Sequence, residues 1–246
     1  MRLFDDWPRS FRALQRFARA VRAGQIDPAQ SVAQARARLL APLRYPRKLF
    51  CVGANYADHL AEMNASIAKV PGRPPFFFMK PANAIVPNGT AIPYPQVTKD
   101  LHHEIEMVVA LGKGGANVPV DRALDLVWGY GVGLDMTRRD IQGEAKKMGR
   151  PWEMGKAFDN SAPCTALHPA SRVGHPAKGA IWLKVNGVVK QKGDLSEMIW
   201  NVPETIAYLS KMITLRAGDV IMSGTPAGVG PVQKGDQLEE IGRAHV

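Results

Sequence analysis

The run of nine residues from His103 to Leu111 constrains the fold more than any other stretch of the chain. Its second half is apolar and β-branched, which predicts a β-strand, and alternate residues of a strand share a face. Glu104 and Glu106 therefore lie on one face, about 7 Å apart. Two like charges this close need to be separated or neutralised. A hard divalent cation bound through carboxylate oxygens would do so; an edge strand with a hydrated polar face is the alternative.

The composition fits one sizeable domain of ordinary globular type. The chain has 246 residues, of which 46% are hydrophobic, enough to bury a substantial core. It contains no apolar run of the length that a membrane helix needs and no secretory signal, so we expect no membrane partner. Cys51 and Cys164 form no CxxC pair. They predict small buried side chains in a cytoplasmic protein kept reduced by its surroundings.

Positive charge is concentrated at the N-terminus, where residues 1–50 contain eleven Lys and Arg against three Asp. A basic arm can bind nucleic acid, and an Arg-rich leader resembles a mitochondrial transit peptide. The arginines are spread at helical spacing without a recognition motif, and Asp5 and Asp6 argue against a transit peptide. We therefore expect solvated helix faces and no nucleic-acid partner. Residues 1–47 are predicted to form a helical appendage to a domain over residues 48–246.

Local patterns predict the remaining elements. Apolar residues at helical spacing between Phe11 and Val21, followed by Gly24, predict one helix, and Asp27-Pro28 begins a second. Strands that outnumber interspersed helices after residue 48 indicate the α+β class. Strands are expected over 48–52, 76–79, 103–111, 127–135, 180–185, 188–190 and 219–224, and helices over 57–64, 121–126, 138–149 and 203–212.

Glycine has two distinct uses in this pattern. Asn186-Gly187 predicts a tight hairpin turn. Glycines alternate between 129 and 133, which suggests a strand approached closely by another backbone or by a ligand. The spacing does not match G-x-G-x-x-G, and no βαβ pattern surrounds it, so we exclude a dinucleotide site.

Several titratable and aromatic residues carry more than one interpretation. His59 and Glu62 are neighbours at i and i+3 of a predicted helix, a spacing that also occurs in surface pairs of no function. His102 and His103 have no spaced His or Cys partner for zinc. We expect His102 in a loop and His103 packed in the strand. The tryptophans, Trp152 among them, are expected in the core or an interface.

Seven motifs, in order along residues 48–242, resemble those of the fumarylacetoacetate hydrolase family. Within this family the chain is most similar to the bacterial fumarylpyruvate (acylpyruvate) hydrolases, through the Pro-Pro-Phe-Phe-Phe-Met-Lys-Pro run that begins at Pro74 and Gly149-Arg-Pro-Trp-Glu153. The seven motifs are G-x-N-Y-x-x-H-x-x-E at residues 53–62, Lys80-Pro81, Glu104-x-Glu106, the Asp-Met-Thr-Arg-Arg-Asp-Ile-Gln run that begins at Asp135, Lys156-Ala-Phe-Asp159, Val185-Asn186-Gly187 and Gly224-Thr-Pro-Ala-Gly-Val-Gly230.

The resemblance implies an α+β fold built on a mixed β-sheet roll with peripheral helices, a homodimer, and a bound Mg²⁺ or Mn²⁺. It also implies a role for individual residues of this chain. They are Glu104, Glu106 and Asp135 as metal ligands, His59, Glu62 and Lys156 as catalytic residues, and Arg139, Gln142 and Thr225 as substrate contacts. Arg73, Lys80 and Arg150 are further candidates for binding a distal carboxylate of the substrate.

The chemistry of a 3-acylpyruvate suits such a site. Its carboxylate and ketone oxygens can chelate a hard cation that three carboxylates leave partly open. Hydrolysis needs a base for the water and positive charge beside the enolate that leaves, roles that suit His59 and Lys156. The leading hypothesis is hydrolysis of fumarylpyruvate to fumarate and pyruvate in aromatic catabolism. Decarboxylation of oxaloacetate, or another lyase or isomerase reaction, is the alternative, and a non-catalytic nucleic-acid binder is a third.

Overall fold

The computed structural model describes residues 7–26, 43, 46–62 and 74–242. The chain divides into two compact units, Met1–Leu40 and Ala41–Val246, and each is described by itself. Within the described residues, no helix is both long and apolar enough to cross a membrane.

The first unit contains α1 (Trp7–Arg22), which confirms the first predicted helix. Gly24 follows it with a φ of +68°, and its amide donates to the carbonyl of Val21 while the amide of Gln25 donates to that of Ala20. This pair of hydrogen bonds is the Schellman motif that ends helices at glycine. The second predicted helix, from Asp27, lies outside the described residues.

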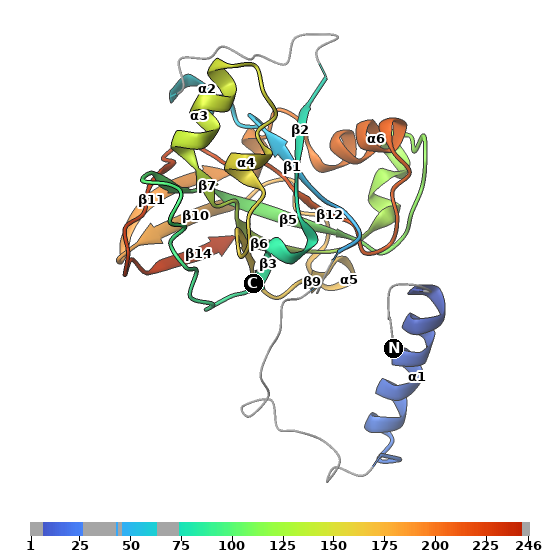
Figure 1. Ribbon diagram of the computed structural model, residues 1–246. Coiled ribbons are helices and arrows are strands. Elements are labelled where there is room, and N and C mark those ends of the chain that lie inside the picture. The colour runs from blue at the N-terminus through green and yellow to red at the C-terminus, as the bar shows by residue number, and fades with distance from the viewer. Residues whose placement is uncertain (1–6, 27–42, 44–45, 63–73, 243–246) are drawn as a thin grey trace. The chain divides into compact units, whose positions relative to one another are not determined.

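The second unit is built on an eight-stranded sheet in the order β2-β1-β12-β5-β6-β8-β3, with β9 paired to β6. β1 pairs in parallel with β12, and β3 with β8, whereas the other pairs are antiparallel. The sheet curls (Figure 1). Its strands are β1 (Leu49–Gly53), β2 (Phe76–Lys80), β3 (Ile85–Pro87), β5 (Ile105–Leu111), β6 (Val127–Leu134), β8 (Ala162–Cys164), β9 (His168–Pro169) and β12 (Val220–Met222).

Two smaller sheets and a set of short helices complete the unit, so the predicted α+β class with peripheral helices is confirmed. One small sheet has the order β11-β10-β14, with β10 (Ala180–Val185), β11 (Val188–Asp194) and β14 (Leu238–Gly242). The other has the order β13-β4-β7, with β4 (Leu101–His103), β7 (Thr137–Arg138) and β13 (Gly230–Pro231). The helices are α2 (Ala57–Glu62), α3 (Arg139–Lys147), α4 (Glu153–Lys156), α5 (Ala170–Val173), α6 (Val202–Met212), and the 3-10 turns η3 (Ala82–Ala84), η4 (Val120–Leu126) and η5 (Leu195–Glu197).

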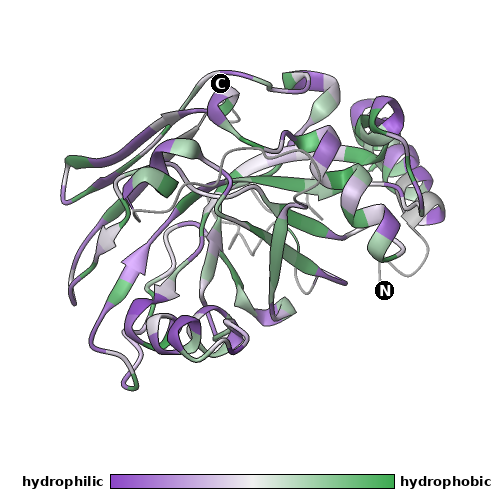
Figure 2. Ribbon diagram, turned by 90° about the horizontal axis from the view of Figure 1, so that it is seen from above, coloured by the Kyte–Doolittle hydropathy of each residue, from purple (hydrophilic) through white to green (hydrophobic). Residues whose placement is uncertain are grey.

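β5 lies in the middle of the large sheet, between β12 and β6, and all seven of its residues are buried. Ile105, Met107, Val109 and Leu111 point into the main hydrophobic core, which confirms the predicted alternation. Figure 2 shows the central strands in the hydrophobic colour. The alternative of a hydrated edge strand is therefore wrong, and Glu106 is buried inside the protein.

The alternating glycines of β6 accommodate a neighbouring backbone. A Cβ on Gly129 would lie 2.3 Å from the carbonyl oxygen of His168, and one on Gly133 would lie 2.9 Å from that of Pro163. No side chain fits at these distances. Of the two options left open by the sequence, close approach of another backbone is the one observed here.

Turn and cap residues behave as their chemistry predicts. Asn186 and Gly187 both have positive φ, 53° and 77°, which is the type I′ hairpin turn between β10 and β11. Asn201 caps α6 by accepting from the amide of Glu204, whose carboxylate accepts from the amide of Asn201 in return. One expectation is wrong: His102 lies in β4 and not in a loop.

Two helices bring polar side chains to one side of the large sheet. α3 packs against α4, and α4 contacts β2 and β7 (Figure 1). The C-terminal ends of β1 and β6 and the start of β5 lie near these helices. Side chains from all these segments therefore meet around one cavity.

Candidate functional site

The three acidic side chains singled out by the sequence converge on one point. The register of β5 and β6 pairs Ile105 with Leu134, so the next residues in line, Glu104 and Asp135, face each other, and the Asp135 amide donates to the Glu104 carbonyl at 2.8 Å. Glu106 is two residues further along the strand. One carboxylate oxygen from each of Glu104, Glu106 and Asp135 lies within 4.8 Å of the others. Strand pairing thus assembles a buried triad of oxygen donors.

Lys156, at the end of α4, bridges two members of this triad. Its buried ammonium donates to Glu104 Oε2 at 2.7 Å, to Asp135 Oδ2 at 2.6 Å and to Thr137 Oγ1 at 2.7 Å. Burial alone would lower the pKa of Lys156, but the charges of Asp135 and Glu104 raise it above its ordinary value. Lys156 is therefore a fixed positive charge with all three donors used.

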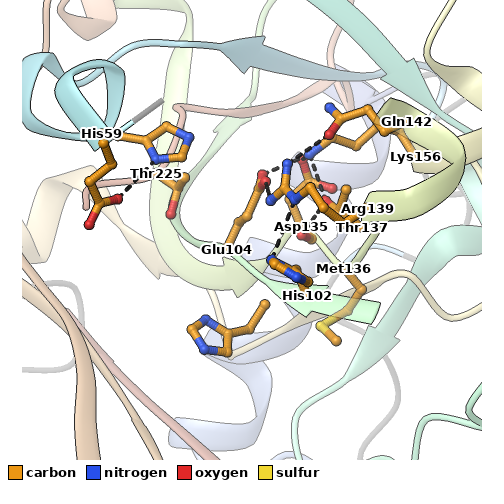
Figure 3. A network of polar contacts seen from close by, with 12 residues as sticks. His59, His102, Glu104, Asp135, Met136, Thr137, Arg139, Gln142, Lys156 and Thr225 are labelled. Atoms are coloured by element: carbon orange, nitrogen blue, oxygen red, sulfur yellow. Dashed lines mark hydrogen bonds and ion pairs between the residues drawn. The ribbon is translucent and has the colours of Figure 1, made fainter. Parts of the chain in front are cut away.

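Arg139 provides a second positive charge from the first turn of α3. Its guanidinium donates to Glu104 Oε1, to Gln142 Oε1 at 2.7 Å, and to His102 Nδ1 at 3.4 Å. Burial would raise the pKa of Glu104, but Lys156 and Arg139 together lower it far below its ordinary value. Glu104 is consequently ionised at any physiological pH. In Figure 3, Arg139, Gln142 and Lys156 lie on one side of Glu104, and His59 and Thr225 lie on the other.

Lys80 lies beside the carboxylates and does not line the cavity. Its fully buried ammonium is 2.8 Å from Asp135 Oδ1, but it donates to the carbonyls of Met136 at 3.0 Å and Lys156 at 2.5 Å. The predicted contact of Lys80 with substrate has no support in this arrangement, because the ammonium group is held inside the protein. Of the other two cations suggested for a distal carboxylate, Arg150 is exposed and Arg73 lies outside the described residues.

Glu106 differs from its neighbours because no cation pairs with it among the described residues. Its Oε2 accepts from the amide of Gly224 at 2.7 Å. Gly224 has a φ of +93°, and a Cβ there would lie 2.6 Å from Cβ of Asn55. Burial, followed by the charges of Asp135 and Glu104, raises the pKa of Glu106 well above its ordinary value. The triad thus contains one carboxylate that forms no ion pair among the described residues, although the nearby charge of Lys156 partly offsets the rise in its pKa.

His59 lies across the cavity from Lys156, on the short helix α2. Its side chain is buried, and its Nδ1 is 3.6 Å from Glu62 Oε2, too long for a hydrogen bond. Burial lowers the pKa of His59 below its ordinary value of 6.5, so the imidazole is neutral at pH 7. The two carboxylate oxygens of Glu62 accept instead from the amide of Gly228, at 2.9 and 3.0 Å. The carboxylate of Asp58 accepts from the amide of Ala227 at 3.2 Å. These contacts hold α2 against the loop that carries Thr225.

Gln191 is a structural link that the sequence did not reveal. From β11 its amide donates to Thr225 Oγ1 at 2.8 Å and accepts from the amide of Ile105 at 3.0 Å. Its Oε1 also lies 2.9 Å from His103 Nδ1, which confirms His103 as a packed, hydrogen-bonded strand residue. A single glutamine thus ties the Thr225 loop to the start of β5. No local pattern marks it, because the contacts join segments that are distant in sequence.

The cavity between these groups encloses about 30 Å³. A larger cavity, about 760 Å³, lies between segments 88–94 and 232–240, and none of the predicted site residues lines it. Trp152, expected in the core or an interface, is half-buried and lines the smaller cavity. Sequence reasoning also missed Lys146. Its helical spacing from Arg139 and Gln142 places all three residues on one face of the helix. The lining residues are Val52, Gly53, Ala54, His59, Phe78, Glu104, Glu106, Arg139, Gln142, Lys146, Trp152, Lys156 and Thr225.

The triad suits a hard divalent cation. All three donors are carboxylates, the ligand type that Mg²⁺ and Mn²⁺ prefer. Asp135 Oδ1 is buried and accepts no hydrogen bond among the described residues, although the Lys80 ammonium lies 2.8 Å from it as an ion pair. Together with Glu106, which forms no ion pair among the described residues, this leaves acceptor capacity at the centre of the triad.

Known proteins share the fold and much of the sequence. The family described as fumarylacetoacetate (FAA) hydrolase C-terminal matches residues 48–243. Fumarylpyruvate hydrolase from Pseudomonas aeruginosa, solved with Mn²⁺ and pyruvate, superposes with a TM-score of 0.76 at 48% identity, covering 84% of this chain and 88% of that one. Human mitochondrial oxaloacetate tautomerase FAHD1 is 46% identical over 78% of this chain and 86% of its own length. Escherichia coli oxaloacetate tautomerase YcgM is 42% identical over 80% of this chain and 89% of its own length. The chain belongs to the fumarylacetoacetate hydrolase family.

Proposed function

We propose that this chain is a metal-dependent hydrolase that cleaves the C–C bond of a 3-acylpyruvate, with fumarylpyruvate as substrate and fumarate and pyruvate as products. The observation that carries the proposal is a neutral, buried imidazole, His59, that lines one cavity together with Glu104 and Glu106 of the carboxylate triad. The P. aeruginosa fumarylpyruvate hydrolase, which contains Mn²⁺ and pyruvate, supports it further.

Glu104, Glu106 and Asp135 are proposed to hold the ion, Mg²⁺ or Mn²⁺. When bound, it would supply Lewis acidity to the oxygens of a 2-oxo acid. Lys156 and Arg139, which already contact Glu104, place two further positive charges where an oxyanion or enolate develops. Gln142 and Thr225 line the same cavity and can hydrogen-bond to substrate oxygens. Lys80, paired with Asp135, is assigned the role of fixing that carboxylate.

His59 is proposed as the general base. Its Nδ1 faces Glu62, so Nε2 is the nitrogen that can take a proton from water. The resulting hydroxyl adds to the acyl carbonyl carbon, and the bond from that carbon to C3 of the pyruvate unit breaks. The electron pair leaves as the enolate of pyruvate, which takes the proton back at C3. Proton transfer of this kind contributes about 10²–10⁴ in rate.

Keto–enol tautomerisation of oxaloacetate is the second candidate, favoured by the named relatives at 46% and 42% identity. It needs a base at C3 and positive charge at the ketone oxygen, which the same His59 and Lys156 supply, but it needs no water.

One assay separates the two candidates. The purified protein with Mg²⁺ is first given fumarylpyruvate, and the fumarate and pyruvate formed are measured by chromatography. It is then given oxaloacetate, and the loss of enol absorbance and the release of carbon dioxide are followed. The hydrolase proposal expects equimolar fumarate and pyruvate. Tautomerisation of oxaloacetate without cleavage of fumarylpyruvate supports the second candidate instead, and carbon dioxide as the main product refutes both.

We also propose a homodimer, as the family resemblance implies, located in the cytoplasm and with its catalytic domain over residues 48–246. Analytical ultracentrifugation at micromolar concentration tests the dimer, for which the expected mass is twice the 26.9 kDa of the chain.

A further inference from the structure

One face of α3 is turned to the cavity. Arg139, Gln142 and Lys146 are spaced at i, i+3 and i+7, which places them in a row along a helix, and all three line the cavity. The next residue, Lys147, lies on another face and forms an ion pair with Glu144 at 2.8 Å. Two adjacent lysines therefore have different surroundings, and only one belongs to the cavity.

Lys146 has no ion-pair partner in the described part of the chain. Its ammonium lies 4.6 Å from the centre of the Trp152 ring, a cation–π contact. Partial burial, followed by the positive charge of Arg139, lowers the pKa of Lys146 below its ordinary value. The result is a cation at the cavity wall that forms no ion pair among the described residues, although the charge of Glu104 acts on it from a distance.

Trp152 is itself held in place by aromatic side chains of β2. Its ring centre is 4.6 Å from that of Phe76 and 6.0 Å from that of Phe78. Gly53, which also lines the cavity, leaves room for this cluster, since a Cβ there would meet Phe76 at 2.5 Å. Trp152 thus presents a fixed apolar surface beside the Lys146 ammonium, which suits a flat, conjugated acyl chain that ends in an anion.

The spacing of the cations matches a long dicarboxylate and not a short one. A step of seven residues along α3 leads from Arg139, which contacts Glu104, to Lys146, an axial distance of about 10 Å. A seven-carbon 2,4-dioxo dicarboxylate such as fumarylpyruvate spans roughly 8 Å between its carboxyl carbons, whereas four-carbon oxaloacetate spans roughly 4 Å. The longer molecule therefore matches the axial separation of the two cations more closely than the shorter one does.

We propose that Lys146 determines specificity by pairing with the distal carboxylate of a substrate whose acyl chain lies along Trp152. That the 2-oxo acid end of the substrate lies at the carboxylate triad rests on the proposed function. Lys146 would then favour acylpyruvates with a terminal carboxylate over neutral ones such as acetylpyruvate, and it would make no contact with oxaloacetate.

The kinetic test compares K146M with the matched variant K147M on fumarylpyruvate and acetylpyruvate. K146M is expected to raise KM about tenfold for fumarylpyruvate, equivalent to about 1.4 kcal/mol, and to leave kcat and the acetylpyruvate KM unchanged. K147M is expected to match the wild type on both substrates, and K146R to restore most of the fumarylpyruvate KM. An equal change for both substrates, or no change for either, overturns the proposal.

A binding measurement keeps the test separate from the proposed reaction. Titration calorimetry with Mn²⁺ present compares 2-oxoadipate with 2-oxohexanoate, which has the same chain length but ends in a methyl group. The wild type and K147M are expected to prefer 2-oxoadipate, and K146M is expected to lose that preference. If the wild type hydrolyses no acylpyruvate, the proposed function fails, but a preference for 2-oxoadipate that K146M loses still supports the role of Lys146. If all three proteins prefer 2-oxoadipate to the same extent, that role is overturned.

Discussion

Glu106 and Lys156 show how unevenly charge is balanced among single residues of the site. Lys156 donates to Glu104 and Asp135, whereas Glu106 accepts from a backbone amide and has no cationic partner in the described structure. A buried carboxylate without a counter-charge destabilises the folded chain. In this account Glu106 is retained because it helps to bind the cation.

The variant E106Q tests this at the level of stability. Without metal, its melting temperature is expected to equal or exceed that of the wild type, since burial disfavours ionisation of Glu106 and the glutamine is neutral. With Mn²⁺ at 100 times its dissociation constant, the wild type should gain about 2.7 kcal/mol and E106Q much less. Thermal unfolding with and without Mn²⁺ measures both. The control E144Q, at an exposed carboxylate, should behave as the wild type; equal stabilisation of E106Q by Mn²⁺ would rule Glu106 out as a ligand.

His59 supplies a prediction on pH dependence. Because burial lowers its pKa, kcat/KM should fall with decreasing pH through a midpoint below 6.5, where the imidazole becomes protonated and can no longer accept a proton. H59A should lose about 10²–10⁴ in kcat, lose this acidic limb, and bind Mn²⁺ as the wild type does. Steady-state kinetics from pH 5 to 8 and metal titration check these outcomes. Loss of metal affinity in H59A would show that its role is misassigned.

At the scale of elements, the pairing of β5 with β6 creates the site. The register that aligns Ile105 with Leu134 also sets Glu104 opposite Asp135, and the glycines of β6 let the segment 163–169 pack against it. Changes in β6 should therefore affect the site through the sheet, at a distance from any substrate.

G129A is the sharpest such change. Its Cβ would lie 2.3 Å from a carbonyl oxygen, so the backbones must separate, at a cost expected to be about 1–3 kcal/mol. The control is G143A, in the interior of α3, where a Cβ meets nothing within 4 Å and the gain in helix propensity should stabilise the protein by up to about 1 kcal/mol. Urea unfolding measures both. A G129A variant as stable as the wild type would contradict the observed packing.

Local sequence was sufficient for the longer elements and for part of the site, but it did not predict short elements such as β8, α4 and α5. Period-two alternation predicted which β5 residues face the core, and Asn186-Gly187 predicted its hairpin, because each depends on neighbours in the chain. The convergence of Asp135 on Glu104 depends on strand register, so spacing alone could not give it; the family resemblance did. Contacts such as Gln191 to Thr225 join distant segments and left no local pattern.

Over the whole molecule, every candidate site residue lies in the unit Ala41–Val246, while most of the net positive charge lies within residues 1–50. A variant without residues 1–40, the whole of the first unit, is therefore expected to keep the kcat and KM of the full chain. Kinetics of the two proteins check this. If the N-terminal residues instead bind nucleic acid, the full chain should bind DNA with an affinity that falls steeply with salt, and the truncated chain should not.

The central claim is that three carboxylates, assembled by strand pairing, bind one divalent cation that engages a 2-oxo acid. Anomalous diffraction from a crystal grown with Mn²⁺ and oxalate tests it most directly. We predict one strong peak about 2.1–2.2 Å from an oxygen of each of Glu104, Glu106 and Asp135, with oxalate completing the coordination. A peak elsewhere, or none at this triad with Mn²⁺ in excess, would contradict the account.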